Sequence, residues 1–241
     1  MPAIHPTFRS KTRAVMLAAN TNQLRDPIGE MDSMAFYIAC HRGQEVCRQA
    51  IADEHWYRVV SGMVRKSTLL IDGRRRIVDF FLPGDFFGFS TRDERAFNVE
   101  AVIEGTVVTR YPRRQMEALA EAHPEVGRLI RQMAFESISR LQARILILGH
   151  PTALTKVCAF LVEMANRSSG PQTLIVALPM SRYDIADYLA LSVETVSRAL
   201  TELKHRGTID LTNKHRVLIM SRTKLEGDLG NARSLAPRQC V

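Results

Sequence analysis

The segment Met180–Leu200 reads MSRYDIADYLALSVETVSRAL and predicts two short helices joined by a tight turn. Ser181 suits the N-cap of the first helix, and Asp184 three residues later would complete a capping box. The residues 190–192 are compatible with a turn, and Ser192 can cap the second helix. This pattern is typical of a helix-turn-helix, whose second helix lies in the major groove of DNA.

The second predicted helix has two chemically different faces. Val196, Leu200 and Leu203 recur at helical spacing and would face inward. On the opposite face, Arg198 can donate two hydrogen bonds to guanine, and Glu194 can accept one from the amino group of cytosine. We therefore predict that bases are read by Glu194, Ser197 and Arg198. A solvated amphipathic helix pair is the alternative, and the two caps with the turn favour DNA reading.

The residues that follow predict the wing of a winged helix. Gly207 suits a helix C-cap, and the segments 208–211 and 216–220 alternate like two strands around a basic tip. Basic and hydroxyl side chains here would contact phosphates, so affinity should fall steeply with salt. The predicted backbone contacts are Ser181, Arg182, Thr195, Thr201, Lys204, Lys214 and Arg216.

Composition sets broad limits on the function. The chain has 241 residues and a formal net charge of +8, which favours an anionic partner. It contains no apolar run of membrane-spanning length and no N-terminal signal pattern, so we expect a cytoplasmic protein with no membrane partner. The four cysteines lack metal-ligand spacing, and no catalytic constellation stands out. We expect no cofactor, no metal site, no catalytic residues and no enzymatic activity.

Two further regions predict structure. Short strands with glycine turns between Phe36 and Tyr111 indicate an antiparallel barrel or jelly roll, with Asp72-Gly73 as a hairpin turn. A helical run then begins at Pro124, and its apolar residues alternate in steps of four and three. This heptad seam predicts a homodimer, a single core helix in a monomer being the alternative. Leu146 lies on a second flank expected to pack on the barrel. The seam residues are Ala134, Ile138, Leu141, Ile145 and Leu148.

Four motifs together resemble the CRP/FNR family of transcription regulators. They are VETVSR (193–198), VSGMVR (60–65), DGRRRIVDF (72–80) and PGDFFGF (83–89), and the first is similar to the FixK-type branch. The resemblance covers about residues 36–222. It implies an α+β fold, with an N-terminal β jelly roll like cyclic-nucleotide-binding domains, a long dimerisation helix and a C-terminal winged helix-turn-helix domain. The expected boundaries are an N-terminal extension (1–35), the barrel (36–122), the dimerisation helix (123–150), the DNA-binding domain (151–223) and a disordered tail (224–241).

The resemblance also implies a function. The target would be a palindrome with TTGAT and ATCAA halves, with Arg198 on G, Glu194 on C and Ser197 near a thymine. As an activator the protein would touch RNA polymerase through the turn formed by Asp72, Gly73 and Arg74. The alternative is that the arginines 74–76 form a solvated hairpin tip. The implied processes are microoxic respiration, denitrification or nitrogen fixation.

Effector binding is not expected. Cyclic-nucleotide-binding relatives carry a carboxylate where this chain has Phe89, and Arg95 is the only match for their phosphate-binding arginine. The candidate haem ligands His41 and His55 are expected in solvated turns or loops, and the first 150 residues hold too few cysteines for an iron–sulfur cluster. The alternative is a small-molecule-dependent sensor-regulator of the same fold, responding to a cyclic nucleotide or haem.

Overall fold

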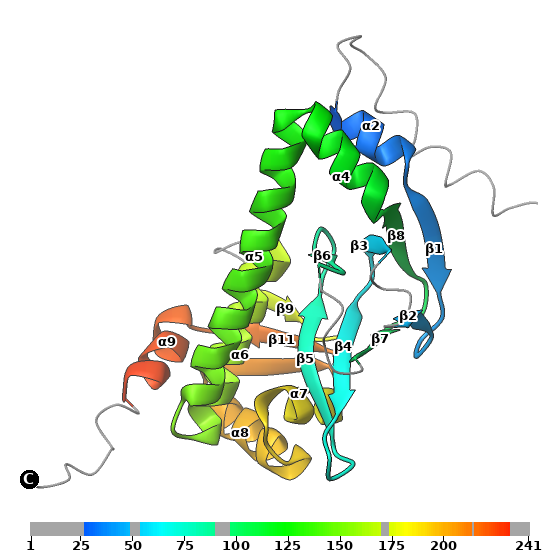
Figure 1. Cartoon of the computed structure of the whole chain (residues 1–241). Helices are drawn as coiled ribbons and strands as arrows, with labels where there is room; N and C mark the ends of the chain where they lie inside the picture. The colour runs from blue at the N-terminus through cyan, green and yellow to red at the C-terminus, as the bar shows by residue number, and fades with distance from the viewer. Residues whose placement is uncertain (1–26, 49–53, 90–96, 170–173, 214, 232–241) are drawn as a thin grey trace, which may run out of the picture.

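The computed structural model describes residues 27–48, 54–89, 97–169, 174–213 and 215–231. Their N-terminal half is a barrel of two antiparallel four-stranded sheets, with strand orders β1-β8-β3-β6 and β2-β7-β4-β5 (Figure 1). The strands are β1 (Phe36–Cys40), β2 (Glu45–Arg48), β3 (His55–Ser61), β4 (Val64–Leu69), β5 (Arg75–Phe81), β6 (Phe86–Phe87), β7 (Phe97–Ala101) and β8 (Thr106–Pro112). The predicted jelly roll is therefore confirmed.

The barrel is filled by alternate side chains from both sheets. Tyr57 and Val59 of β3 meet Val64 of β4 and Phe81 of β5 in one buried cluster. The ring of Phe87 stacks on Tyr57 with their centroids 5.2 Å apart. Alternation along each strand places these residues on the inner face, which the period of two in a strand requires.

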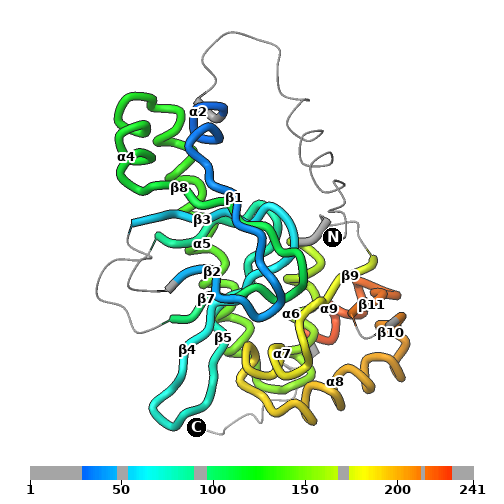
Figure 2. The backbone as a smooth tube through the Cα atoms, turned by 90° about the vertical axis from the view of Figure 1, so that its right-hand side faces the viewer, coloured from blue at the N-terminus to red at the C-terminus, as the bar shows by residue number. Residues whose placement is uncertain are grey.

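The hairpin between β4 and β5 extends from the barrel toward the helices α7 (Arg182–Leu189) and α8 (Val193–His205), as both ribbon views show (Figures 1 and 2). Its turn is at Asp72-Gly73, as the sequence predicts, and Gly73 has a φ of +79° that favours glycine. The Gly73 amide donates to the carbonyl of Leu70 at 2.9 Å.

Three helices cover one end of the barrel, and the last of them then runs back along its side (Figure 1). They are α2 (Pro27–Ser33), α4 (Arg113–Ala122) and α5 (Pro124–Gly149). Met31 of α2, Met116 of α4 and Val126 of α5 are buried in one cluster with Trp56 and Tyr111 of the barrel. α5 begins with a proline in its first turn, a position that favours a helix start. It runs for 26 residues along the long axis of the molecule (Figure 1).

The C-terminal half consists of helices around a small sheet of order β10-β11-β9. Besides α7 and α8 it contains α6 (Ala153–Ser169), β9 (Ile175–Ala177), β10 (Ile209–Asn213), β11 (Arg216–Ile219) and α9 (Arg222–Asn231). Its core is continuous with the barrel, because Ile77 and Phe80 of β5 share a buried cluster with Leu161 of α6 and Tyr188 of α7.

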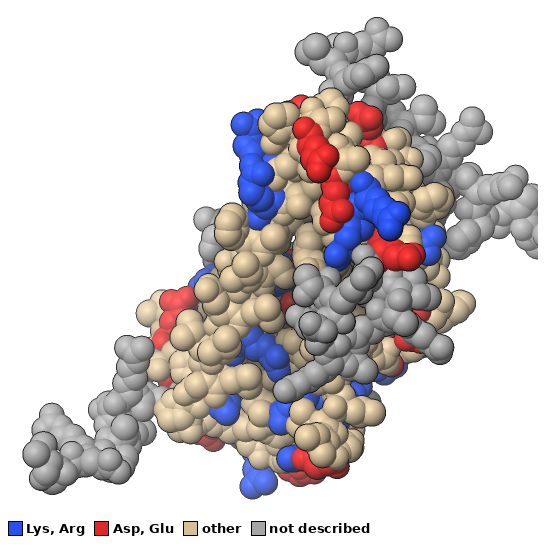
Figure 3. Space-filling model, viewed as in Figure 1, with Lys and Arg blue, Asp and Glu red and all other residues tan. Residues whose placement is uncertain are grey.

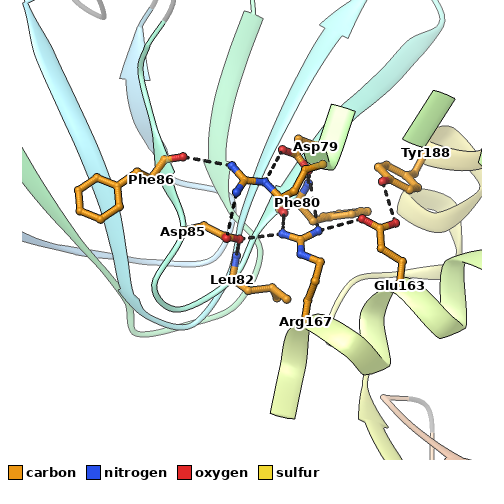
Figure 4. Close-up of polar contacts among 9 residues, drawn as sticks. Asp79, Phe80, Leu82, Asp85, Phe86, Glu163, Arg167 and Tyr188 are labelled. Carbon is orange, nitrogen blue, oxygen red and sulfur yellow. Dashed lines mark hydrogen bonds and ion pairs between the residues drawn. The ribbon is translucent and has the colours of Figure 1, made fainter. Parts of the chain in front are cut away.

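A polar network also joins the barrel to α5 and α6 (Figure 4). Arg140 of α5 lies 3.4 Å from Asp79 and 3.3 Å from Asp85. Arg167 of α6 lies 2.7 Å from Asp85 and 3.3 Å from Glu163. All five side chains are buried or nearly so, and each charge in the network faces at least one opposite charge.

The structure adds helices at both chain ends, and the C-terminal one contradicts an expectation. The disordered tail expected from residue 224 is helical as far as Asn231, because Leu225 is fully buried in the core and the Ser221 hydroxyl accepts from the Lys224 amide at 3.2 Å. The extension expected to end at residue 35 contains α2, which Met31 anchors. Residues 1–26 and 232–241 lie outside the described part of the chain.

Candidate nucleic-acid interface

The first helix of the predicted motif begins with the capping box that its sequence indicates. The Ser181 hydroxyl accepts from the Asp184 amide at 3.1 Å, and the Asp184 carboxylate accepts from the Ser181 amide at 3.0 Å. Ala190 ends α7 in the left-handed conformation with a φ of +57°. The amide of Leu191 then donates to the carbonyl of Ala186 at 3.0 Å, which closes the turn.

The second helix, α8, starts at the second predicted cap. The Ser192 hydroxyl accepts from the Thr195 amide at 3.2 Å. Val196, Leu200 and Leu203 are buried against α6 and α7. This packing fixes the rotation of α8 about its axis, so the opposite side of the helix must face solvent.

The exposed side of α8 carries the three predicted base-reading residues. Glu194, Ser197 and Arg198 are all exposed. Hydrogen bonds from the backbone and from Ser192, together with the charge of Arg198, hold the pKa of the Glu194 carboxyl below its usual range. Glu194 is therefore a carboxylate acceptor at neutral pH, and Arg198 lies one helical turn further along the same face.

A hollow of about 670 Å³ lies beside this face and is shared with α6. Arg198, Thr201 and Arg206 of α8 line one side of it, and Ala153 and Leu154 at the start of α6 line the other. Sequence reasoning missed this contribution of α6. The sequence feature that marks the start of α6 is Thr152, whose hydroxyl caps the helix by accepting from the Thr155 amide at 3.2 Å.

The predicted phosphate-contacting cations differ in their exposure and in the partners they already have. Lys204 lies 3.2 Å from Asp210 and is half exposed, whereas Arg216 is exposed on the wing strand β11. Burial lowers the pKa of Arg182, which is half-buried in the first turn of α7, and its Nη1 has no hydrogen-bond partner within the described residues. Lys214 lies outside the described residues.

Predicted hydroxyl contacts are engaged within the protein. The Ser181 hydroxyl serves the cap of α7. The Thr201 hydroxyl donates to the carbonyl of Ser197 at 3.0 Å, and the Thr195 hydroxyl lies 2.9 Å from that of Ser192. Thr201 is exposed, and its hydroxyl can donate to a phosphate only by giving up its bond to Ser197. Thr195 is half-buried.

Comparisons with known proteins agree with this geometry. Residues 155–227 match the Crp-like helix-turn-helix domain, and residues 38–123 match the cyclic nucleotide-binding domain. The nitrogen fixation regulation protein FixK of Azorhizobium caulinodans is 42% identical over 76% of this chain and 75% of its own length. The transcriptional activator protein FnrL of Cereibacter sphaeroides is 29% identical over 91% of this chain and 89% of its own. The solved structure of FixK2 from Bradyrhizobium japonicum is 35% identical, with a TM-score of 0.72, over 80% of this chain and 96% of that one.

The chain belongs to the CRP/FNR family, in its FixK-type branch. It is therefore a DNA-binding transcription regulator and not an enzyme. Among the described helices, none has both the length and the apolar character that crossing a bilayer requires.

In this FixK-type regulator the three arginines at the end of the β4–β5 hairpin differ in their surroundings. Arg74 is exposed and lies 2.6 Å from the Asp72 carboxylate. The solvated-tip alternative is wrong for the next two arginines, which reach α7: Arg75 lies 2.8 Å from Asp187, and Arg76 donates to the Asp187 carbonyl at 3.4 Å. Of the three arginines, Arg74 pairs with Asp72 instead of with α7, and it lies at the end of the hairpin beside the exposed Asp72 and Gly73.

The heptad face of α5 is largely uncovered in the single chain. Ile138 is 49% exposed, Leu141 43% and Ile145 68%. Ala134 and Leu148, at the ends of the predicted seam, are half-buried. On the face seen in Figure 3, the surface over the middle of α5 is mostly uncharged.

On the second apolar flank of α5, the position of Leu146 differs from the prediction. Leu146 was expected on the barrel, but it is 72% exposed, because the barrel is contacted instead by the long arginines Arg140 and Arg144. Phe135 is exposed as well. These residues widen the apolar surface along α5.

The barrel residues at the candidate nucleotide and haem positions lie in different surroundings. Phe89 packs on Trp56 with ring centroids 5.4 Å apart. The exposed His41 lies 2.5 Å from Glu104, while His55 is half-buried in β3. Arg95 lies outside the described residues.

Two cysteines have thiols of low reactivity. Burial raises the pKa of both Cys47 and Cys158 to about 12. Their thiols are therefore protonated at neutral pH and unsuited to redox reactions, which require the thiolate.

Proposed function

We propose that this regulator activates transcription as a homodimer on a palindrome with TTGAT and ATCAA half-sites, without a bound effector. The observation that carries the proposal is the exposed polar face of α8, which two capped helix starts and a left-handed turn hold in place. In the major groove, Arg198 would donate to O6 and N7 of guanine and Glu194 would accept from N4 of cytosine. Ser197 would lie near a thymine.

Phosphate contacts would fix the protein on the duplex around these base contacts. Arg216 of the wing and Arg182 of α7 are the cations proposed for this role, with Lys204 and Lys214. Ser181, Thr195 and Thr201 are the proposed hydroxyl contacts. Desolvation of Arg182 costs free energy that a phosphate partner would offset.

Two features support a dimer: the limited reach of a single recognition helix and the exposed apolar face of α5. One recognition helix reads few bases, whereas a twofold pair covers half-sites about 34 Å apart. The exposed seam residues Ile138, Leu141 and Ile145 of α5 supply an apolar helix face suited to pairing with a second copy.

Activation would use the end of the β4–β5 hairpin. Asp72, Gly73 and Arg74 are exposed there, and we assign them the contact with RNA polymerase. The relatives named nitrogen fixation regulation protein FixK support control of nitrogen-fixation genes. Genes for microoxic respiration or denitrification are the other targets that the family resemblance implies.

The effector-free state is supported by the barrel. At the position where the family resemblance expects a nucleotide-binding carboxylate, Phe89 instead offers an aromatic ring packed on Trp56. An apolar ring cannot accept the hydrogen bond of a ribose hydroxyl.

Footprinting with purified, effector-free protein tests the proposal. Protection of a TTGAT/ATCAA palindrome, but not of a scrambled duplex of the same composition, is the expected result. Affinity should fall steeply as salt is raised, because phosphate contacts release counterions. If protection appears only after a cyclic nucleotide or haem is added, the protein is instead a small-molecule-dependent sensor-regulator.

A further inference from the structure

Five charged side chains of alternating sign connect the barrel to the first turn of α7. Glu100 of β7 lies 2.6 Å from Arg65 of β4, and Arg65 lies 3.0 Å from Asp184. Asp184 lies 2.7 Å from Arg75 of β5, which also lies 2.8 Å from Asp187. We call these five residues the interdomain clamp. In this row every cation lies between two anions.

Asp184 has two separate tasks within the clamp. Its Oδ2 atom accepts from the Ser181 amide and hydroxyl at 3.0 and 2.8 Å and so closes the capping box. Its Oδ1 atom accepts from Arg65 at 3.0 Å and from Arg75 at 2.7 Å. The carboxylate that begins α7 is therefore the same group that ties α7 to the barrel.

The centre of the clamp is shielded from water, whereas Arg75 and Asp187 at its end are 32% and 30% exposed. The side chain of Asp184 is only 4% exposed and that of Arg65 18% exposed. A buried carboxylate with two guanidinium partners is held much more firmly than a surface ion pair, because removing either partner leaves charge uncompensated.

The clamp holds α7, and none of its ion pairs involves the predicted base-reading residues of α8. Arg65 and Arg75 reach α7 from the barrel, whereas Glu194 and Arg198 remain exposed on α8. In the single chain, the closed clamp therefore leaves the polar face of α8 exposed.

We propose that Arg65 and Arg75 are positioning residues for DNA recognition, which set the orientation of the helix-turn-helix relative to the barrel and α5. The inference rests on the proposed function, because its advantage arises when two recognition helices must reach two half-sites together. Once one half-site is bound, a firmly held second helix-turn-helix meets its own half-site at a high effective concentration. A loosely attached one loses this gain.

Binding to two duplexes tests the clamp. Arg75→Glu is compared with wild type on the full palindrome and on a duplex carrying one half-site, at one salt concentration. We expect about tenfold weaker binding of the palindrome and a much smaller change on the half-site, because only the palindrome needs both helices. A purely electrostatic effect of the charge change would weaken both duplexes equally.

Two further variants make the test specific. Arg75→Glu combined with Asp187→Arg restores an opposite-charge pair between β5 and α7 and should recover part of the palindrome affinity, because the carboxylate introduced at position 75 still lies beside Asp184. Asp187 is chosen over Asp184 because it takes no part in the capping box. Arg114→Glu on the exposed surface of α4, which makes the same charge change far from α7, should leave the ratio of the two affinities as in wild type (Figure 1).

Hydrogen–deuterium exchange of the DNA-free protein separates failure of the clamp from failure of the proposed function. Faster exchange in α7 and β5 of Arg75→Glu, partly reversed in the double variant, supports the clamp even if wild type does not prefer the palindrome. In that case it is the proposed function that fails. Unchanged exchange, equal losses on both duplexes, or tighter palindrome binding by Arg75→Glu would overturn the clamp.

Discussion

Nη2 of Arg167 on α6 lies 2.7 Å from Oδ2 of Asp85 in the barrel, and the two side chains are only 14% and 19% exposed. The other carboxylate oxygen of Asp85 faces Arg140 of α5 at 3.3 Å. One barrel carboxylate thus joins two helices, of which α5 carries the proposed dimer seam and α6 begins the DNA-binding half.

Replacing Arg167 by alanine should destabilise the protein strongly. The change leaves Asp85, Asp79 and Glu163 with less positive charge nearby, and breaking a buried pair costs about 3–5 kcal/mol. Urea unfolding at neutral pH measures the loss. Arg114→Ala, on the exposed face of α4, is the control and should change stability by no more than about 0.5 kcal/mol. A loss under about 1 kcal/mol for Arg167→Ala would mean that the network contributes little.

The same network predicts a pH dependence. Burial raises the pKa of Glu163 above its usual value of 4.5, so the folded protein holds this proton more tightly than the unfolded chain does. Stability from this group is complete below about pH 4.5 and is lost as the pH rises through the folded pKa. Glu163→Gln should therefore match wild type near pH 4.5 and gain stability relative to it toward pH 7.5.

Urea unfolding at a series of pH values measures this difference. Glu117→Gln on the exposed surface of α4 is the control, and its curve should run parallel to that of wild type. Parallel curves for Glu163→Gln as well would show that burial does not penalise the Glu163 charge.

The local features of the site were predictable because they depend on neighbours in sequence. The caps at Ser181 and Ser192 each use an amide three residues away. Buried and exposed positions on α8 follow from helical spacing alone. For the same reason the heptad pattern of α5 located its uncovered face.

The contacts that position these elements could not be predicted. Arg75 and Asp184 are 109 residues apart, and nothing in the local pattern pairs them. The strand β9 has three residues, too few for a recognisable alternation, and is held by pairing with β11. The helix α9 contains two glycines, and burial of Leu225 overrides their low helix propensity.

Arg198→Ala should remove the preference for the G·C pair of each half-site. Losing a bidentate contact costs about 1–3 kcal/mol of discrimination, while the phosphate contacts that give weak nonspecific binding remain. Titrations with the palindrome, with a variant changed at that pair, and with scrambled DNA measure the effect. Equal weakening on all three duplexes would show that Arg198 contacts the backbone and not a base.

The end of the β4–β5 hairpin should be separable from DNA binding. Replacing both Asp72 and Arg74 by alanine removes an exposed pair that does not touch α7. We expect unchanged affinity for the palindrome and reduced transcription in a reconstituted assay with RNA polymerase. Full transcription by this variant would exclude the turn as a polymerase contact.

Placing glutamate at both Ile138 and Ile145 should separate the dimer. In a paired helix each new carboxylate would be buried opposite its own copy, where desolvation and like-charge repulsion both oppose association. Light scattering should then give the mass of one chain, 27.2 kDa, in place of twice that value. Ser139→Glu, exposed on α5 but outside the heptad seam, is the matched control and should remain dimeric. The separated chains should keep nonspecific DNA binding, because α8 is intact, but lose preference for the palindrome over a single half-site. An unchanged mass for the double variant would place the dimer contact elsewhere than on this face of α5.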